Sequence, residues 1–253
     1  MEYFETIQKT VYKKDPRPIK SFLSLMQRLI PTVKIEYTPN YMIIDGIDKH
    51  HIAYGKMVIQ GAQNFTFGSE IEPVFVETEE ALKILKKGRK EGTELEIDNE
   101  TMTLRVNGTT YKIPVIEKPE YYNIPCLPKK DDYPADIVIN PHNLKKLFTL
   151  KSEKDRISVD VKKDKITLNI PINNFETIKL EHKLAVEAEK EFETGISLQI
   201  LKKIFMGAEN ILPAGIMQFD DNYKPIRIEI NNFNVIASYP KYMIEIYIAP
   251  VVR

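Results

Sequence analysis

The chain has 253 residues, of which 43% are hydrophobic, which is enough for one large or two ordinary domains with buried cores. Its 36 basic residues balance 36 acidic ones, so any attraction to nucleic acid must come from local segregation of charge. The apolar runs are too short to span a bilayer, no signal-peptide pattern opens the chain, and Cys126 is the single cysteine. These features exclude an internal disulfide and predict a cytoplasmic protein that does not enter a membrane.

The first half is predicted to contain two helices, each followed by a β-hairpin. Five apolar residues at helical spacing form one face of the first helix: Phe22, Leu25, Met26, Leu29 and Ile30. Alternating segments at 33–37 and 41–44 then predict a hairpin. A second amphipathic, lysine-bearing helix at 82–88 ends at a glycine, and strands at 95–97 and 102–106 form the next hairpin.

Residues 117–131 have a different character, with three prolines and little periodicity. Proline removes a backbone donor and biases the residue before it toward extended geometry. This segment is therefore predicted to be an extended connector that lies on the surface of the fold.

The second half repeats the plan of helix and hairpin. Three apolar residues after Pro141 predict a short third helix: Leu144, Leu147 and Phe148. A fourth helix is predicted at 201–207. The accompanying hairpins are predicted from strands at 157–161 and 166–168, and from strands at 217–219 and 226–230.

These elements indicate an internal duplication. The segment 82–88 (LKILKKG) returns 119 positions later as 201–207 (LKKIFMG), and each copy runs into a strand. We expect an α+β protein with two similar domains, at 1–116 and 132–253, joined by the connector. A repeated charged surface suits a scaffold better than a single catalytic pocket.

Basic residues recur on the predicted helices. The candidates for a DNA-facing surface are Lys20, Arg28, Lys83, Lys86, Lys87, Lys90, Lys145, Lys146, Lys202 and Lys203. On any single helix these lysines could simply form a solvent-exposed face. All four helices, however, carry more Lys than Glu on this face in a chain without net charge, and this pattern favours a surface that contacts phosphates. Because no aromatic residue alternates with these lysines, we expect duplex DNA held by its backbone without sequence preference.

No catalytic or metal-binding motif is present. Neighbouring His50 and His51 would point to opposite faces of a strand, and Cys126 has no histidine near it in the sequence. We therefore expect no enzyme activity, no metal and no cofactor. A hydrolase whose carboxylates meet only in three dimensions stays an alternative, as does a non-clamp duplicated DNA-binding module.

Several segments carry a family resemblance: 45–53 (DGIDKHHIA), 82–88, 124–128 (IPCLP), 201–208 and 247–250 (YIAP). In their order and spacing they resemble the DNA sliding clamps of the proliferating cell nuclear antigen (PCNA) family, in its archaeal form, over nearly the whole chain. The resemblance implies a duplicated DNA-clamp fold and a ring of three subunits whose helices surround duplex DNA. It also implies that the protein tethers DNA polymerase, flap endonuclease and DNA ligase, and that an ATP-dependent clamp loader opens it.

The same resemblance implies a pocket under the connector that accepts a short partner peptide. By position its residues are Ile47, His51, Ile124, Leu127, Pro225, Tyr247, Ala249 and Pro250. It further implies that the strands around 110–115 and 176–181 pair between neighbouring subunits and complete a sheet that otherwise has free edges. The residues expected at this subunit interface are Tyr111, Ile113, Val115, Thr177, Ile178 and Leu180.

The chain departs from the family pattern at two basic helix positions, where Gln27 and Met206 stand. Such divergence suits either a homotrimer or one specialised subunit of a heterotrimeric clamp. The sequence leaves these alternatives open.

Overall fold

The computed structural model describes residues 9–12, 16–37, 41–60, 65–67, 72–88, 93–140, 155–172, 176–184, 187–205, 215–221, 224–231 and 242–251. All strand pairs in this part of the chain are antiparallel. Together with the helices they confirm the predicted α+β class.

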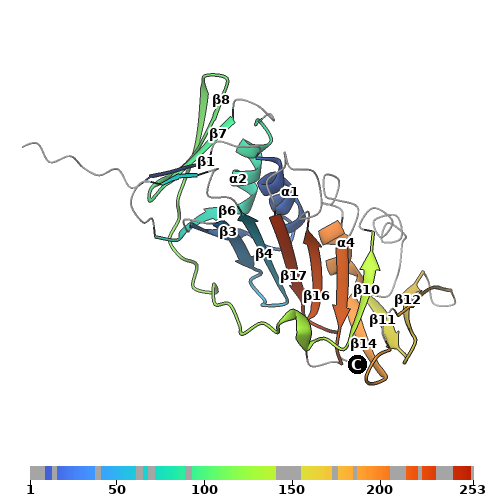
Figure 1. The fold of residues 1–253 in the computed structure, drawn as a ribbon. Coiled ribbons are helices and arrows are strands. Elements are labelled where there is room, and N and C mark those ends of the chain that lie inside the picture. Colours follow the sequence, from blue (N-terminus) through green and yellow to red (C-terminus); the bar gives the residue numbers. More distant parts are fainter. Residues whose placement is uncertain are drawn as a thin grey trace, which may run out of the picture.

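An eight-stranded sheet forms the centre of the molecule (Figure 1). In spatial order its strands are β10 (Ala135–Ile139), β15 (Gly215–Phe219), β16 (Ile226–Asn231), β17 (Tyr242–Ile248), β4 (Ala53–Gln60), β3 (Tyr41–Ile47), β2 (Thr32–Tyr37) and β6 (Val74–Glu77). The two halves of the chain meet where β4 pairs with β17. One continuous sheet therefore crosses both halves.

Two smaller sheets lie at opposite ends of the molecule (Figure 1). The first has the order β5 (Phe65–Phe67), β1 (Lys9–Tyr12), β7 (Thr93–Asp98), β8 (Thr101–Val106) and β9 (Thr109–Pro114). The second has the order β13 (Thr177–Lys183), β12 (Lys165–Pro171), β11 (Arg156–Val161) and β14 (Phe192–Ser197). Among the described strands, β9 and β5 are the two edges of the first sheet, and β13 and β14 are the two edges of the second.

The four predicted hairpins are confirmed as pairs of adjacent strands: β2 with β3, β7 with β8, β11 with β12, and β15 with β16. The predicted third helix lies outside the described residues. The other three predicted helices are present as α1 (Arg17–Met26), α2 (Thr78–Leu85) and α4 (Leu198–Phe205), and a single 3₁₀ turn, η2 (Lys130–Asp132), follows the connector.

Helix ends differ from the prediction. The helix α1 stops at Met26, although the apolar pattern continues to Ile30. Between them the chain forms a turn in which the N–H groups of Leu29 and Ile30 both bond to the carbonyl of Met26, and Pro31 follows. The helix α2 stops at Leu85, and the chain then tightens, since the N–H groups of Lys87 and Gly88 bond to carbonyls three residues back. The predicted end at glycine is therefore reached by a 3₁₀-like turn.

The three helices pack together, with α1 in contact with both α2 and α4, and they lie along one face of the central sheet (Figure 1). Gly46 and Gly55 oppose each other where α1 approaches this sheet. A Cβ atom at Gly46 would collide with the side chain of Ile30, and one at Gly55 with that of Met26. The missing side chains thus allow the close helix-to-sheet contact that closes the main core.

Candidate functional site

Three aromatic and aliphatic residues form a row across three neighbouring strands. Ile47 at the end of β3 lies opposite Tyr54 in β4, and Tyr54 lies opposite Tyr247 in β17. The rings of Tyr54 and Tyr247 are tilted by 46° with their centroids 6.1 Å apart. This row is the floor of a small second core, separate from the main one.

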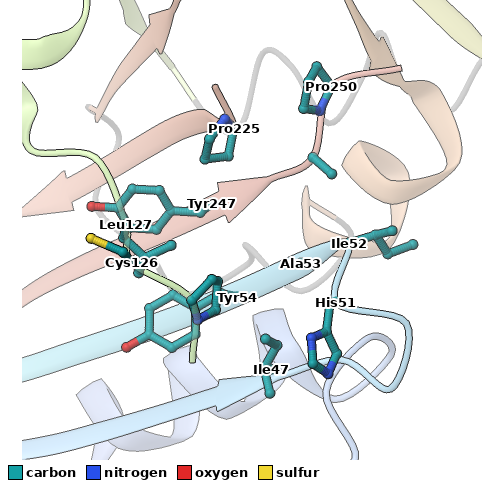
Figure 2. Close-up of a pocket in the computed structure, with 12 residues that line it drawn as sticks. Ile47, His51, Ile52, Ala53, Tyr54, Cys126, Leu127, Pro225, Tyr247 and Pro250 are labelled. Atoms are coloured by element: carbon teal, nitrogen blue, oxygen red, sulfur yellow. The ribbon is translucent and has the colours of Figure 1, made fainter. Parts of the chain in front are cut away.

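A cavity of about 250 Å³ opens above this floor (Figure 2). Its walls come from three distant parts of the chain: the β3–β4 turn, the connector, and the segments around Pro225 and the end of β17. The lining residues are Ile47, His51, Ile52, Ala53, Tyr54, Pro125, Cys126, Leu127, Pro225, Tyr247, Ala249 and Pro250. The volume suits one or two inserted side chains better than a cofactor.

Every residue that the resemblance placed in this pocket lines the cavity or packs beside it. Ile124 is the one that does not line it, because its side chain packs into the second core from the connector. The sequence analysis missed Tyr54, which the register puts directly opposite Ile47. The exposed Cys126, which the sequence analysis did not place in the pocket, also lines the cavity.

The turn between β3 and β4 is shaped by Asp48. Its carboxylate accepts hydrogen bonds from the N–H groups of His50 (2.9 Å) and Ala53 (2.6 Å). His50 and His51 therefore lie in a turn, so the assumption that they lie in a strand was wrong. His51 adopts a left-handed backbone conformation, with φ of 58°, which a turn of this tightness requires.

The connector is fastened over the floor at three points. Nε2 of His51 is 2.9 Å from the carbonyl oxygen of Tyr121. The ring of Tyr122 is buried edge-on against Phe75, with centroids 4.9 Å apart, and its hydroxyl donates a hydrogen bond to Asp45. Farther along, the hydroxyl of Tyr247 lies 3.4 Å from the carbonyl oxygen of Pro128.

Charged groups lie beside the pocket on the same face of the sheet, because residues that oppose each other on neighbouring strands project to the same side. Arg227 in β16 lies opposite Tyr247 in β17. Its guanidinium contacts the carboxylates of Glu229 and Glu245 at 2.5 Å each. Burial lowers the pKa of Arg227, but the two carboxylates raise it more, so the group stays charged. Burial, followed by the nearby carboxylates, raises the pKa of the Tyr54 and Tyr247 phenols, so the floor is neutral. The pocket is thus an apolar receptor with a largely buried cluster of charged groups beside it.

The described part of the chain holds no group of three or more His, Cys, Asp or Glu side chains placed to bind a metal. None of the described helices is long and apolar enough to cross a membrane. The mainly apolar lining of the pocket suits the binding of apolar side chains.

The basic residues on the described parts of the helices differ in their surroundings. Lys83 pairs with Glu80 at 2.6 Å and with Glu79 at 3.5 Å, whereas Lys86 and Lys87 lie exposed in the turn after α2. Lys87 lies over the ring of Tyr111, 4.6 Å from its centroid. Among the remaining candidates, Arg28 and Lys203 are exposed and Lys20 and Lys202 half-buried, while Lys90, Lys145 and Lys146 lie outside the described residues.

The residues expected at the subunit interface lie on the two sheet edges. Tyr111 and Ile113 belong to β9, Val115 follows it, and Thr177, Ile178 and Leu180 belong to β13. Tyr111, Val115, Ile178 and Leu180 are half-buried against the main core. Each edge thus offers apolar side chains that a further strand would cover.

No protein-family profile matches the chain, and no curated protein sequence matches it. Solved structures match it over nearly the whole length. PCNA from Entamoeba histolytica has a TM-score of 0.75 at 15% identity and covers 97% of this chain and 100% of its own. PCNA from A. fulgidus, solved with the C-terminal region of FEN-1 bound, has a TM-score of 0.74 at 16% identity, covering 97% and 98%.

The PCNA2–PCNA3 complex from Sulfolobus tokodaii gives a TM-score of 0.73 at 16% identity and covers 96% of this chain and 98% of the other. Identities this low establish the fold alone. The chain has the PCNA clamp fold, as the sequence resemblance predicted.

Proposed function

We propose that this chain is a subunit of a sliding clamp, which encircles duplex DNA as a ring of three and tethers replication and repair enzymes. The main support for this proposal is that the fold of the chain matches clamp structures over 96–97% of its length, including both halves. A clamp acts as a topological link and performs no reaction, and the described residues offer a binding pocket and no group placed to hold a metal ion.

In this proposal the helical face meets DNA. Lys86, Lys87 and Lys203 are exposed at the ends or on the surface of α2 and α4, and they supply long flexible cations for phosphate contacts. Lys83 contributes less, because two glutamates of its own helix already neutralise it. Contacts of this kind hold a duplex without reading its bases.

The pocket under the connector is the proposed docking site for partner enzymes. A short peptide that inserts an apolar side chain would bury it against Tyr54, Leu127 and Tyr247. The proposed partners are DNA polymerase, flap endonuclease and DNA ligase, with a clamp loader that opens the ring. The A. fulgidus PCNA, which shares the fold of this chain, was solved with the C-terminal region of FEN-1 bound.

The test is topological. The chain is incubated with a clamp loader, ATP and nicked circular duplex DNA, and the DNA is then isolated in high salt. A clamp stays on the circle and is lost when a restriction enzyme linearises it, because the ring slides off the free ends. Equal retention on circular and linear DNA would identify an ordinary DNA-binding protein, and no retention on either would reject the proposal.

A further inference from the structure

The connector is set deepest into the fold at Tyr122. Of residues 117–131, all of which the structure describes, Tyr122 is the one buried residue, with an exposed fraction of 4%. The chain turns just before it, since the N–H group of Tyr122 bonds to the carbonyl of Pro119 at 2.9 Å. Tyr122 is therefore the point at which the connector enters the interior of the protein.

The ring of Tyr122 belongs to the same second core as the floor of the pocket. The buried members of this core are Ile47, Tyr54, Phe75, Tyr122 and Tyr247. Tyr122 meets Phe75 of β6 edge-on, with an angle of 82° between the rings. The carbonyl of Phe75 also accepts a hydrogen bond of 2.8 Å from the N–H group of Ile116, where the connector begins. Phe75 thus holds the connector twice, once through its backbone and once through the ring of Tyr122.

The hydroxyl of Tyr122 reaches a carboxylate that is already held in place. Asp45 lies two residues before Ile47 in β3, so its side chain projects from the same face of the sheet as the pocket floor. Its Oδ2 atom is 3.2 Å from Nζ of Lys34, and its Oδ1 atom accepts the hydrogen bond from Tyr122. Because Asp45 is buried, water competes poorly for this bond, and losing it would leave a buried oxygen without its donor.

The other two described contacts of the connector are weaker. Nε2 of His51 lies 2.9 Å from the carbonyl oxygen of Tyr121, but His51 is exposed, so water competes for both groups. The hydroxyl of Tyr247 is 3.4 Å from the carbonyl oxygen of Pro128, which is long for a hydrogen bond that a hydroxyl donates. The bond from Tyr122 to Asp45 is therefore the strongest of the three.

The connector residues that line the cavity follow directly after Tyr122. Pro125, Cys126 and Leu127 lie three, four and five residues later and line it, whereas Tyr122 is not among the lining residues. Ile124 packs into the second core on the way. Five residues of extended chain span at most roughly 17 Å. A change at Tyr122 thus reaches the wall of the pocket through a short piece of chain.

We infer that Tyr122 is a positioning residue for partner docking. Its hydrogen bond to Asp45 holds the connector where Leu127 completes the pocket. The inference rests on the proposed docking of partner peptides and adds a residue that sets their affinity without contacting them. When the connector is released at Tyr122, the pocket is complete in only a fraction of the molecules, and the apparent Kd rises in inverse proportion to that fraction.

Tyr122→Phe tests the inference, because it keeps the ring against Phe75 and removes the hydrogen bond to Asp45. The first measurement is the Kd of a fluorescently labelled peptide from the C-terminal region of FEN-1, the segment bound in the A. fulgidus structure. The second is the rate at which Cys126, the single cysteine of the chain, reacts with N-ethylmaleimide. This rate reports how firmly the connector is held, since local opening exposes the thiol further.

Two controls separate the hydrogen bond from general effects. Tyr121→Phe makes the same chemical change one residue earlier, and it keeps the backbone carbonyl that His51 contacts. Val159→Ala truncates a buried side chain of β11 in the main core, so it lowers stability without changing the connector. Circular dichroism checks that each variant folds. If Tyr122→Phe does not fold, Phe75→Leu takes its place, because it withdraws the ring that packs against Tyr122.

We expect Tyr122→Phe to raise the Kd of the peptide about threefold to tenfold, as when about a third to a tenth of the molecules keep a complete pocket. The labelling of Cys126 should become several-fold faster, and both controls should stay close to wild type. An unchanged Kd or an unchanged labelling rate in folded Tyr122→Phe overturns the inference, as does an equal change in Val159→Ala. These outcomes leave the docking function standing, whereas a wild type that binds no such peptide rejects that function and the inference with it.

Discussion

Replacing Tyr247 with Ala should weaken the binding of a partner peptide by removing part of the pocket floor. An aromatic side chain buries roughly 200 Å² on docking. If the Tyr247 ring supplies about a quarter to a half of that contact, its loss costs about 1–2.5 kcal/mol at about 25 cal/mol for each Å². This corresponds to a rise in Kd of about 5-fold to 70-fold from a micromolar starting value.

The assay is titration of a fluorescently labelled peptide from the C-terminal region of a clamp-binding nuclease. Tyr247→Phe keeps the ring and removes the two 3.4 Å contacts of its hydroxyl, to the Pro128 carbonyl and to the Glu245 carboxylate, so its Kd should stay within about threefold of wild type. Val138→Ala, at a side chain 72% exposed on β10 and outside the pocket lining, serves as the control for a surface truncation.

Stability must be followed in parallel. Tyr247 is only 6% exposed, so Tyr247→Ala also opens a cavity and should lower the free energy of unfolding by about 3–5 kcal/mol. If that variant does not fold, Leu127→Ala removes a half-buried wall on the connector instead. Unchanged peptide affinity in a folded Ala variant of either residue would refute the pocket as the docking site.

Three further predictions follow from the fold and its charges. Tyr122→Phe should lower the free energy of unfolding by about 1.5–3 kcal/mol at pH 7, measured in urea. Burial raises the pKa of Asp45 in the folded protein, so the free energy of unfolding falls as pH rises above the ordinary pKa of an aspartate. Without the Tyr122 hydroxyl the pKa of Asp45 rises further. The difference in stability between Tyr122→Phe and wild type should therefore shrink near pH 4, where Asp45 takes up a proton. Lys86→Ala should reduce the salt dependence of DNA retention by more than Lys83→Ala, and equal slopes would contradict the pairing of Lys83 with its glutamates. Burial raises the pKa of Asp220, but hydrogen bonds from lysines lower it more. Its contribution to stability is therefore present above the ordinary pKa of an aspartate and is lost as pH falls through the lowered pKa. Asp220→Asn should make the free energy of unfolding depend less on pH in this acidic range.

Local patterns predicted the hairpins because strand alternation reports burial on one face of a sheet. The same patterns predicted too long a first helix, because Leu29 and Ile30 continue the apolar spacing and pack against the core although α1 ends at Met26. The pairing of Lys83 was readable in the sequence, because Glu79 and Glu80 lie four and three residues before it.

The pocket shows what the sequence could not supply by pattern alone. The family resemblance predicted its main residues, and the structure brings together the β3–β4 turn, the connector and the C-terminal segments that carry them. Tyr54 escaped notice because Ala53, Tyr54 and Gly55 are all buried, so the strand shows no alternation there. Tyr122 escaped because its partner, Asp45, is 77 residues away and becomes a neighbour only when the connector folds back.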